Sequence, residues 1–466
     1  MNISKLQHVY FVGIGGIGMS ALARYFKAIG KNVSGYDKTP TPLTDELVRE
    51  GIEVHFKDDA ALLPEIFRSS FADQDSAMVV YTPAVPKDHV QLNFLKTKGY
   101  SILKRSEVLG LITRNAYTIA VAGTHGKTTT SSMVAHLLRF SGMDCSAFLG
   151  GITKNYNTNL LIGSGKEKST VVVEADEYDR SFLTLFPDVA VITSMDADHL
   201  DIYGDKGYME ESYRLFAKQL KPGGTLIYKK GLPIGANSDE HVYADYSVES
   251  NANYYASDIH IENHRYHFNW NGGNEVLKDL TSEMPGMHNV ENAVAAIAVA
   301  RHLGISDDKI KQGLATYSGV KRRFDYQVKN DTVIYIDDYA HHPEELRACI
   351  ASARELYPGK RILGIFQPHL FTRTRDFVDG FANSLSMLDD LMLLEIYPAR
   401  EKPIEGVNSK LILDKVTLQN KTLTSMAEFP EVLKNHSFDV LLTLGAGDID
   451  QLVGPIREYF LHSKEN

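Results

Sequence analysis

Cysteine is scarce in this chain of 466 residues, which contains only Cys145 and Cys349. Two cysteines are too few for a disulfide framework or a zinc ribbon, and they fit a reducing compartment. Long apolar runs are also missing: Leu6–Ala23, the longest uncharged stretch, contains four glycines together with Gln7 and His8. It is too polar to span a bilayer, and it lacks the basic segment and cleavage site of a signal peptide. We therefore expect a cytoplasmic protein without a membrane partner.

Positive charge is in short supply as well. The chain has 49 lysines and arginines against 59 aspartates and glutamates, a net charge of −10 at pH 7. Such a chain is a poor general binder of phosphate backbones, so we expect no nucleic-acid partner and local basic clusters for anionic substrates. Hydrophobic residues make up 43% and charged residues 23%, as in folded globular proteins, which excludes wholesale disorder.

Short β-branched or aromatic runs alternate with segments of helical period, such as Ser20–Ile29, along most of the chain. This alternation predicts an α/β fold of parallel sheets with helices on both faces. It breaks around Arg105–Thr113 and Gly319–Arg323, and it weakens between Gly231 and Leu280 into what we interpret as an insertion or meander of short strands. We predict three domains: Rossmann-like at 1–112, a central P-loop ATPase type at 113–318, and Rossmann-like at 319–466. The expected strands are His8–Val12, Val33–Tyr36, Met78–Tyr81, Tyr117–Ala122, Thr170–Glu174, Val189–Thr193, Thr225–Tyr228, Val333–Asp337, Arg361–Phe366, Leu391–Glu395 and Val440–Leu444.

A glycine motif lies between the first expected strand and helix. Gly13, Gly15 and Gly18 form G-x-G-x-x-G, with Gly16 between them. Glycine lets the backbone approach a diphosphate, and the helix N-terminus offers free N–H groups. Asp37 ends the next expected strand, where it can accept from a ribose hydroxyl. The motif predicts binding of a nucleotide diphosphate; a tight structural turn is the alternative.

A second glycine loop follows Tyr117–Ala122 and reads Gly-Thr-His-Gly-Lys-Thr-Thr. In such loops the lysine reaches the β- and γ-phosphates and the following hydroxyl ligates Mg²⁺. The general pattern places glycine at position 121, where this chain has Val121. The strand–loop–helix context still predicts that the loop binds ATP or GTP phosphates. Its residues are Gly123, Thr124, His125, Gly126, Lys127, Thr128 and Thr129.

Acidic and basic residues follow several later strands. Glu174 ends one strand and His199 lies just beyond another, so both belong to the edge where the phosphate loop is expected, and the carboxylate suits Mg²⁺.

Arg322 and Arg323 form either a solvated linker or a clamp on the γ-phosphate. In the last domain, Asp337–Pro343 and Phe366–Arg375 bring carboxylates, histidines and arginines to one rim. Capture of a small zwitterion fits this rim better than a transition-metal site.

These motifs resemble those of the Mur ligases, ATP-dependent enzymes that form amide bonds in peptidoglycan precursor synthesis. The resemblance covers nearly the full length, and its last four motifs are specific to the member that adds L-alanine. The matching segments are Val12–Met19, Ala122–Thr129, Glu174–Glu177, Asp196–Asp201, Gly286–Asn292, Arg322–Asp325, Asp337–Pro343, Gln367–Thr374, Ile396–Val407 and Gly445–Ile449.

The resemblance implies where each ligand binds. It implies a UDP-sugar diphosphate on the first glycine loop with Asp37, and ATP on the second loop, with its adenine beside Asn289 and Asn292. Taken alone, these asparagines are typical of an N-cap and a helix-surface residue. It further implies Mg²⁺, with Mn²⁺ as the alternative ion, on Thr128, Glu174 and His199. It implies catalytic roles for Lys127, Arg323, Asp338 and His341, and an alanine pocket made by Tyr339, His341, His369 and Arg373.

Two positions depart from the family pattern. Many members have arginine where this chain has Leu370, so that contact is not carried over. Some relatives carry a modified lysine after the Asp-His segment, and the register of Lys218 does not allow that role to be transferred.

The resemblance also implies the reaction. L-alanine is joined to UDP-N-acetylmuramate at the expense of ATP, through an acyl phosphate, by a monomer or dimer. The alternatives are a recycling ligase that attaches a muramyl peptide to the same sugar, an NAD-dependent oxidoreductase that uses the first glycine loop, and a non-catalytic P-loop regulator.

Overall fold

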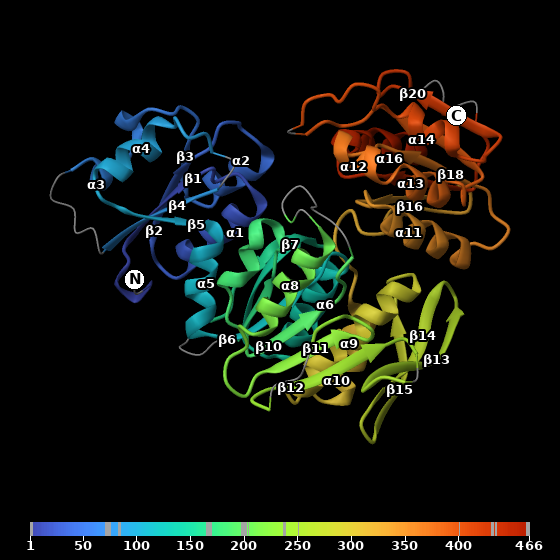
Figure 1. Ribbon diagram of the computed structural model, residues 1–466, viewed down its shortest axis with the longest axis horizontal. Helices are drawn as coiled ribbons and strands as arrows, with labels where there is room; N and C mark the ends of the chain where they lie inside the picture. The colour runs from blue at the N-terminus through green and yellow to red at the C-terminus, as the bar shows by residue number, and fades with distance from the viewer. Residues whose placement is uncertain are drawn as a thin grey trace. The chain divides into compact units, whose positions relative to one another are not determined.

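The computed structural model describes residues 3–69, 76–82, 85–164, 170–196, 203, 205–235, 239–249, 251–399, 401–429, 433 and 436–462 (Figure 1). Strands of this part of the chain form three sheets, of five, ten and six strands. By packing, the chain divides into two compact units. One comprises Met1–Ser257, Trp270–Leu277 and Asn292–Leu314, and the other comprises Asp258–Asn269, Lys278–Glu291 and Ala315–Asn466. The predicted α/β class is confirmed, whereas the domain boundaries at 112/113 and 318/319 stay a prediction.

The first sheet has the strand order β3-β2-β1-β4-β5, and all of its pairs are parallel. This order is that of a Rossmann-type sheet, as the sequence predicts. The strands are β1 (His8–Val12), β2 (Asn32–Tyr36), β3 (Glu53–His55), β4 (Ala77–Tyr81) and β5 (Ser101–Lys104), and the helices are α1 (Ile17–Ala28), α2 (Pro42–Arg49), α3 (Glu65–Arg68), α4 (Val90–Thr97) and α5 (Arg105–Asn115).

The second sheet has the order β15-β14-β13-β12-β11-β10-β6-β9-β7-β8. The region from Gly231 to Leu280 is not irregular: it supplies β12–β15, which are neighbours in the sheet in sequence order, as the meander alternative predicts, and which reach nine residues in length. The strands are β6 (Tyr117–Ala122), β7 (Cys145–Thr153), β8 (Thr158–Leu161), β9 (Thr170–Glu174), β10 (Val189–Ile192), β11 (Thr225–Lys229), β12 (Val242–Ser247), β13 (Tyr254–Glu262), β14 (Arg265–Gly272) and β15 (Glu275–Ser282). The helices are α6 (Lys127–Ser141), α8 (Lys206–Ala217), α9 (Met287–His302) and α10 (Asp307–Thr316), with the 3₁₀ helix η4 (Tyr178–Thr184).

The third sheet has the order β16-β17-β21-β18-β19-β20. β16 is antiparallel to β17, and the other pairs are parallel. The strands are β16 (Asp325–Lys329), β17 (Ile334–Asp338), β18 (Ile362–Phe366), β19 (Asp390–Leu394), β20 (Asn420–Thr424) and β21 (Val440–Leu444), and the helices are α11 (Pro343–Leu356), α12 (Phe371–Asp376), α13 (Val378–Leu385), α14 (Lys410–Lys415) and α16 (Val453–His462).

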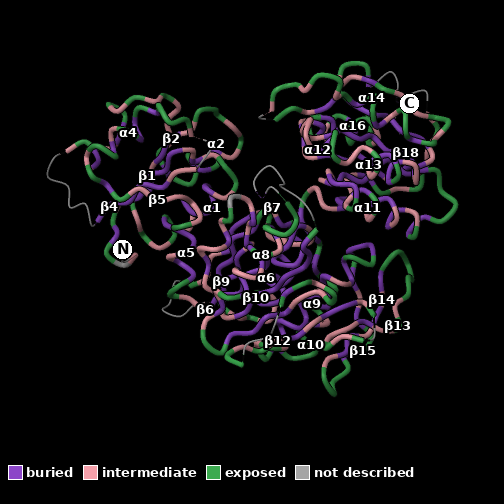
Figure 2. Tube along the Cα trace, in the orientation of Figure 1, coloured by how far each residue is buried: buried purple, intermediate pink, exposed green. Residues whose placement is uncertain are grey.

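The central strands of each sheet form the core. Figure 2 shows burial concentrated on these strands, and the buried residues include all five of β18, β19 and β21. Parallel strands covered by helices on both faces read as continuous apolar runs, which explains why the sequence marks them. Trp270, the single tryptophan, is buried and donates from Nε1 to Val294 O at 3.1 Å. Among the described residues, no helix combines the length and apolarity needed to cross a membrane.

Candidate active site

The first glycine loop follows β1, the point at which the strand order of the first sheet reverses: β2 pairs with one side of β1 and β4 with the other. Ligands of open α/β sheets bind at such points. Gly13 has φ +87°, a left-handed conformation that favours glycine. The Gly15 amide donates to Asp37 Oδ2 at 2.7 Å, and a Cβ on Gly15 would lie 2.8 Å from that oxygen. Asp37 therefore holds the loop, and its contact with a ribose stays a prediction.

A cavity of about 280 Å³ begins at the first turn of α1, beyond the N-cap residue Gly16. Gly18 lies in this turn, and a Cβ there would come within 2.9 Å of Arg105 Cδ. Arg105 is the first residue of α5, and its Nη2 lies 3.3 Å from Asp176 Oδ2. The cavity is lined by apolar residues that include Leu22, Leu109 and Phe148 and by the charged Arg105, Glu174 and Asp176. Sequence reasoning gave Arg105 no role, although a basic residue after a strand is a usable signal.

The second glycine loop leaves β6 between β10 and β9, again at a change of direction. Gly123 has φ +139° and Gly126 has φ +81°. The loop packs against Ser194, whose Oγ accepts the His125 amide at 2.7 Å and lies 2.9 Å from Thr124 Oγ1. The departure at Val121 has a simple cause: this residue is buried within β6, so the loop begins later than the general pattern would place it.

Lys127 begins α6 and folds back on the loop. Its Nζ donates to Gly123 O at 2.5 Å and lies 2.9 and 2.8 Å from Glu177 Oε1 and Oε2. Burial lowers the pKa of Lys127, but the charges of Glu177, Glu174 and Asp176 outweigh it, so the net pKa is raised. Burial raises the pKa of Glu177, partly offset by Lys127. The sequence shows Glu177 only as part of a motif, and its ion pair was not predicted.

The predicted metal site has two of its three members in contact. Thr128 Oγ1 donates to Glu174 Oε1 at 3.1 Å, and the Gly150 amide donates to Glu174 Oε2 at 2.9 Å. Hydroxyl and carboxylate oxygens are the donors that Mg²⁺ prefers, so this pair fits the ion. His199 lies outside the described residues, within which no group of three or more His, Cys, Asp or Glu is arranged to hold a metal. Lys218 ends α8 and is exposed.

The two asparagines of α9 are buried, so the interpretation of Asn292 as a helix-surface residue is wrong. Asn292 Oδ1 accepts from Thr130 Oγ1 at 3.1 Å, and a Cβ on Gly126 would lie 2.8 Å from it. This residue therefore lies beside the phosphate loop, in contact with Thr130 of α6. Asn289 is inside the first turn of α9 and donates from Nδ2 to Pro285 O at 2.6 Å. It is not an N-cap.

Asp338, in the second compact unit, ends β17 and is held by backbone amides. Phe324 N–H donates to Oδ2 at 2.6 Å and Ala340 N–H donates to Oδ1 at 2.7 Å. Burial raises the pKa of Asp338 to about 6, against the lowering effects of Arg323 and the two amides. Arg322 pairs with Asp337 at 3.1 Å, so this basic segment is not a solvated linker.

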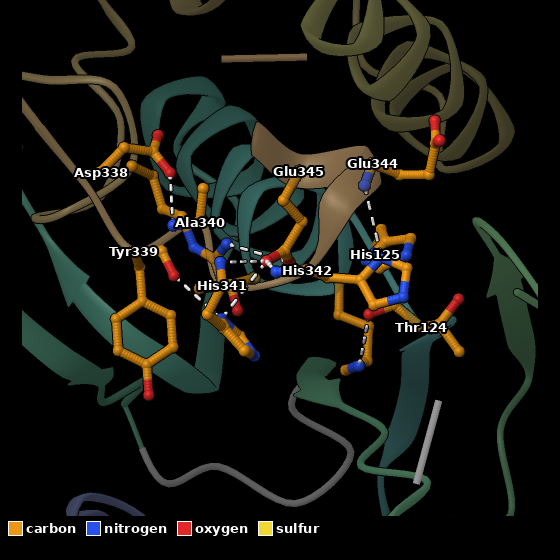
Figure 3. Close-up of polar contacts among 12 residues, drawn as sticks. Thr124, His125, Asp338, Tyr339, Ala340, His341, His342, Glu344 and Glu345 are labelled. Atoms are coloured by element: carbon orange, nitrogen blue, oxygen red, sulfur yellow. Dashed lines mark hydrogen bonds and ion pairs between the residues drawn. The ribbon is translucent and has the colours of Figure 1, made fainter. Parts of the chain in front are cut away.

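His341 forms the centre of a polar cluster with Tyr339 and Glu345 in the second compact unit (Figure 3). Its Nδ1 lies 2.9 Å from Tyr339 O and 3.3 Å from Glu345 Oε2. Glu345 Oε2 also accepts the His341 amide at 3.0 Å, while Glu345 Oε1 lies 3.6 Å from Arg323 Nη1. Burial lowers the pKa of His341, with Glu345 opposing and Arg373 adding to the shift. Glu345 was missed by sequence reasoning, because helical Glu is usually a surface residue.

The remaining alanine-pocket residues lie beside this cluster. The rings of His341 and His369 are 6.0 Å apart, and His369 stacks on Tyr397 at 5.8 Å. Arg373 is buried in α12. Leu370 has φ +73°, a conformation that costs a non-glycine residue energy, and its amide donates to Tyr397 O at 3.0 Å. The structure thus brings Tyr339, His341, His369 and Arg373 together; their contacts with alanine stay predictions.

Three family models cover most of the chain. Residues 8–117 match "Mur ligase family, catalytic domain", residues 121–300 match "Mur ligase middle domain", and residues 322–447 match "Mur ligase, glutamate ligase domain". The chain belongs to the Mur ligase family, as the sequence motifs predict.

Similarity within the family is specific. The chain is 50% identical over 459 residues to UDP-N-acetylmuramate–L-alanine ligase of Parabacteroides distasonis, covering 98% of each chain. It is 50% identical over 463 residues to the ligase of the same name from Flavobacterium psychrophilum, covering 98% of this chain and 99% of the relative. Among solved structures, the UDP-N-acetylmuramate-alanine ligase MurC of Thermotoga maritima matches with a TM-score of 0.80 and 26% identity, over 98% of this chain and 99% of that one.

Proposed function

We propose that this protein joins L-alanine to UDP-N-acetylmuramate at the expense of ATP, giving UDP-N-acetylmuramoyl-L-alanine, ADP and phosphate. The identity of about 50% over nearly the full length to ligases of that name supports this reaction. The structural observation that carries it is the cavity, which runs from Gly18 of the first glycine loop to Glu174 beside the phosphate loop. A sugar held along this cavity by its diphosphate presents its carboxylate to the ATP phosphates.

The first step is transfer of the γ-phosphoryl group of ATP to the muramate carboxylate, which gives an acyl phosphate and ADP. The amides at the start of α6 and the Lys127 ammonium offset the charge on the phosphates. On the sugar side, the Gly13–Gly18 loop and Arg105 hold the diphosphate, since a guanidinium pairs well with phosphate oxygens. Asn292 lies beside the phosphate loop, which supports its predicted place near the nucleotide.

Mg²⁺ would be held by Thr128 and Glu174, with His199 as the predicted third ligand, and it supplies charge neutralisation at the phosphates. Manganese is the alternative ion. Gly150 and Thr128 fix both oxygens of Glu174, so this carboxylate is oriented by the chain itself.

The second step is attack of the alanine amine on the acyl carbon, with loss of phosphate. Arg373 binds the alanine carboxylate, and Tyr339, His341 and His369 surround the amine. The contacts favour His341 over Asp338 as the group that takes the amine proton: burial lowers the pKa of His341, so its ring is neutral near pH 7, whereas both Asp338 oxygens accept backbone amides. Asp338 positions the Arg323 segment, and Arg323 offsets phosphate charge.

The reaction takes place in the cytoplasm on small-molecule substrates, without nucleic acid or membrane, in a monomer or dimer. The test is phosphate release by the purified protein with ATP, Mg²⁺ and UDP-N-acetylmuramate, with L-alanine or a muramyl-type tripeptide as acceptor. Release that requires both L-alanine and Mg²⁺ is the expected result. Release only with the tripeptide would assign the protein to the recycling reaction, and release with neither would refute the proposed reaction.

A further inference from the structure

The ammonium of Lys127 is bound from two directions by the chain itself. On the loop side Gly123 O accepts at 2.5 Å, and on the other side the two Glu177 oxygens lie at 2.9 and 2.8 Å. The Glu177 side chain is only 2% exposed and that of Lys127 is 14% exposed. A half-buried lysine and a buried glutamate therefore form a close ion pair beside the phosphate loop.

Glu177 is fixed in place by its backbone. It precedes η4, and its carbonyl accepts from Tyr203 Oη at 2.5 Å and from the Arg180 amide at 2.9 Å. The Phe182 amide returns to Asp176 O at 2.9 Å, which closes the turn. The backbone of Glu177 is therefore fixed, and Lys127, with the longer side chain, is the member of the ion pair with more rotatable bonds.

The three carboxylates at the end of β9 and just after it have different partners. Glu174 binds Thr128 Oγ1 and the Gly150 amide, and Asp176 lies 3.3 Å from Arg105 Nη2 and accepts the Tyr178 amide. Of these three carboxylates in the described part of the chain, Glu177 is the one within hydrogen-bond distance of the Lys127 ammonium. Glu174, the carboxylate proposed to hold Mg²⁺, is therefore a different residue from Glu177, which pairs with Lys127, although both lie beside the same loop.

We propose that Glu177 is a positioning residue that holds the Lys127 ammonium at the phosphate loop and competes with the nucleotide phosphates for it. The inference rests on the proposed use of this loop for ATP. Two oxygens bound to one ammonium lie about 4.5 Å apart, so a phosphate on Lys127 is close to the Glu177 charge. The repulsion weakens nucleotide binding, which favours release of ADP after each turnover.

The test is calorimetric titration of ADP with Mg²⁺ into the full-length protein and its Glu177 variants. Glu177→Gln keeps the shape and an oxygen acceptor for Lys127 but removes the charge, and we expect ADP to bind about tenfold more tightly. In turnover assays the KM for ATP should fall by a similar factor, while kcat stays within about threefold of the wild type. Glu177→Asp and Glu177→Asn form a second pair that differs only in charge, and the Asn variant should bind ADP more tightly than the Asp variant.

Asp188→Asn is the matched control. Asp188 Oδ2 accepts from Lys221 Nζ at 2.8 Å and from the Thr118 amide at 2.7 Å. It lies at the end of the same sheet where β6 and β10 begin, away from the loop that follows β6. Its removal should leave ADP affinity unchanged. Unchanged or weaker ADP binding in Glu177→Gln, or equal affinities in the Asp and Asn variants, would overturn the role of Glu177. Failure of the wild type to bind ADP would instead refute the proposed use of ATP.

Discussion

The two glycine loops have the same topology but obtain their positive charge in different ways. Each loop leaves a parallel strand at a change of sheet direction and enters a helix. The loop after β6 carries its own cation, Lys127, which Glu177 neutralises. The loop after β1 has no cation of its own; Asp37 closes it, and Arg105 comes from α5. In the proposed reaction, the loop assigned to the moving phosphoryl group thus carries its own cation, whereas the loop assigned to the UDP-sugar diphosphate takes its cation from another element.

The largest effect on turnover should come from removing the Lys127 ammonium. Lys127→Ala should leave the fold intact and reduce turnover by at least about 100-fold, because one key stabiliser of transition-state charge is lost. Phosphate-release kinetics would measure this, with far-ultraviolet circular dichroism as the control for folding. Turnover close to that of the wild type would remove Lys127 from the mechanism and end the contrast between the loops.

Removing Arg105, the cation that α5 supplies to the first loop, should affect binding of the UDP-sugar rather than the chemical step. Arg105→Ala should raise the KM for UDP-N-acetylmuramate by about 30-fold, the scale of one lost charge-assisted hydrogen bond to phosphate. The KM for ATP should change little. Steady-state kinetics with each substrate varied in turn would measure both constants, and an equal rise in the two would show that Arg105 does not belong to the sugar site alone.

Backbone packing of the first loop predicts a difference between neighbouring glycines. A Cβ on Gly15 would lie 2.8 Å from both Asp37 Oδ2 and Thr44 Cγ2, so Gly15→Ala should lower the free energy of unfolding by about 2 kcal/mol. Gly16 has φ −69°, and a Cβ on it would lie 3.8 Å from its nearest neighbour, Met19 Cγ. Gly16→Ala should therefore lower the free energy of unfolding by less than about 0.5 kcal/mol. Urea unfolding would compare the two variants, and equal losses would show that Asp37 does not set the loop.

The smallest effect should come from Asp37. Asp37→Asn keeps an oxygen that can accept the Gly15 amide, so the free energy of unfolding should fall by no more than about 1 kcal/mol. The KM for UDP-N-acetylmuramate should stay within about threefold. A much larger rise in this KM without loss of stability would mean that Asp37 contacts the nucleotide, as its position after β2 first suggests.

Much of this architecture is predictable from sequence, because buried parallel strands are continuous apolar runs. Tyr117–Ala122, Thr170–Glu174 and Val440–Leu444 are predicted to the residue. The short β3 and β5 are missed, since three or four residues of mixed polarity give no periodic signal. For the residues of β12–β15 the sequence leaves an insertion and a meander of short strands as alternatives, because their polar faces weaken the strand signal; the structure has the consecutive strands of the meander alternative.

Within the site, residues that act through a local motif are predictable and their partners are not. The conformation of Gly123–Lys127 follows from one segment, whereas its ion-pair partner Glu177 comes from fifty residues later. Arg105 is likewise recognised only when folding brings it to Gly18, and Glu345 only when folding brings it to Arg323. Long-range pairing of this kind depends on tertiary packing, which spacing along a single sequence does not report.

The two loops are proposed to hold different ligands, and a crossed titration tests this assignment most directly. Calorimetry would measure binding of UDP-N-acetylmuramate, and separately of ADP with Mg²⁺, to the wild type, Lys127→Ala and Arg105→Ala. We predict that Lys127→Ala loses affinity only for ADP and that Arg105→Ala loses affinity only for the UDP-sugar. Loss of both ligands in either variant, or loss of the opposite ligand, would contradict the assignment of the loops.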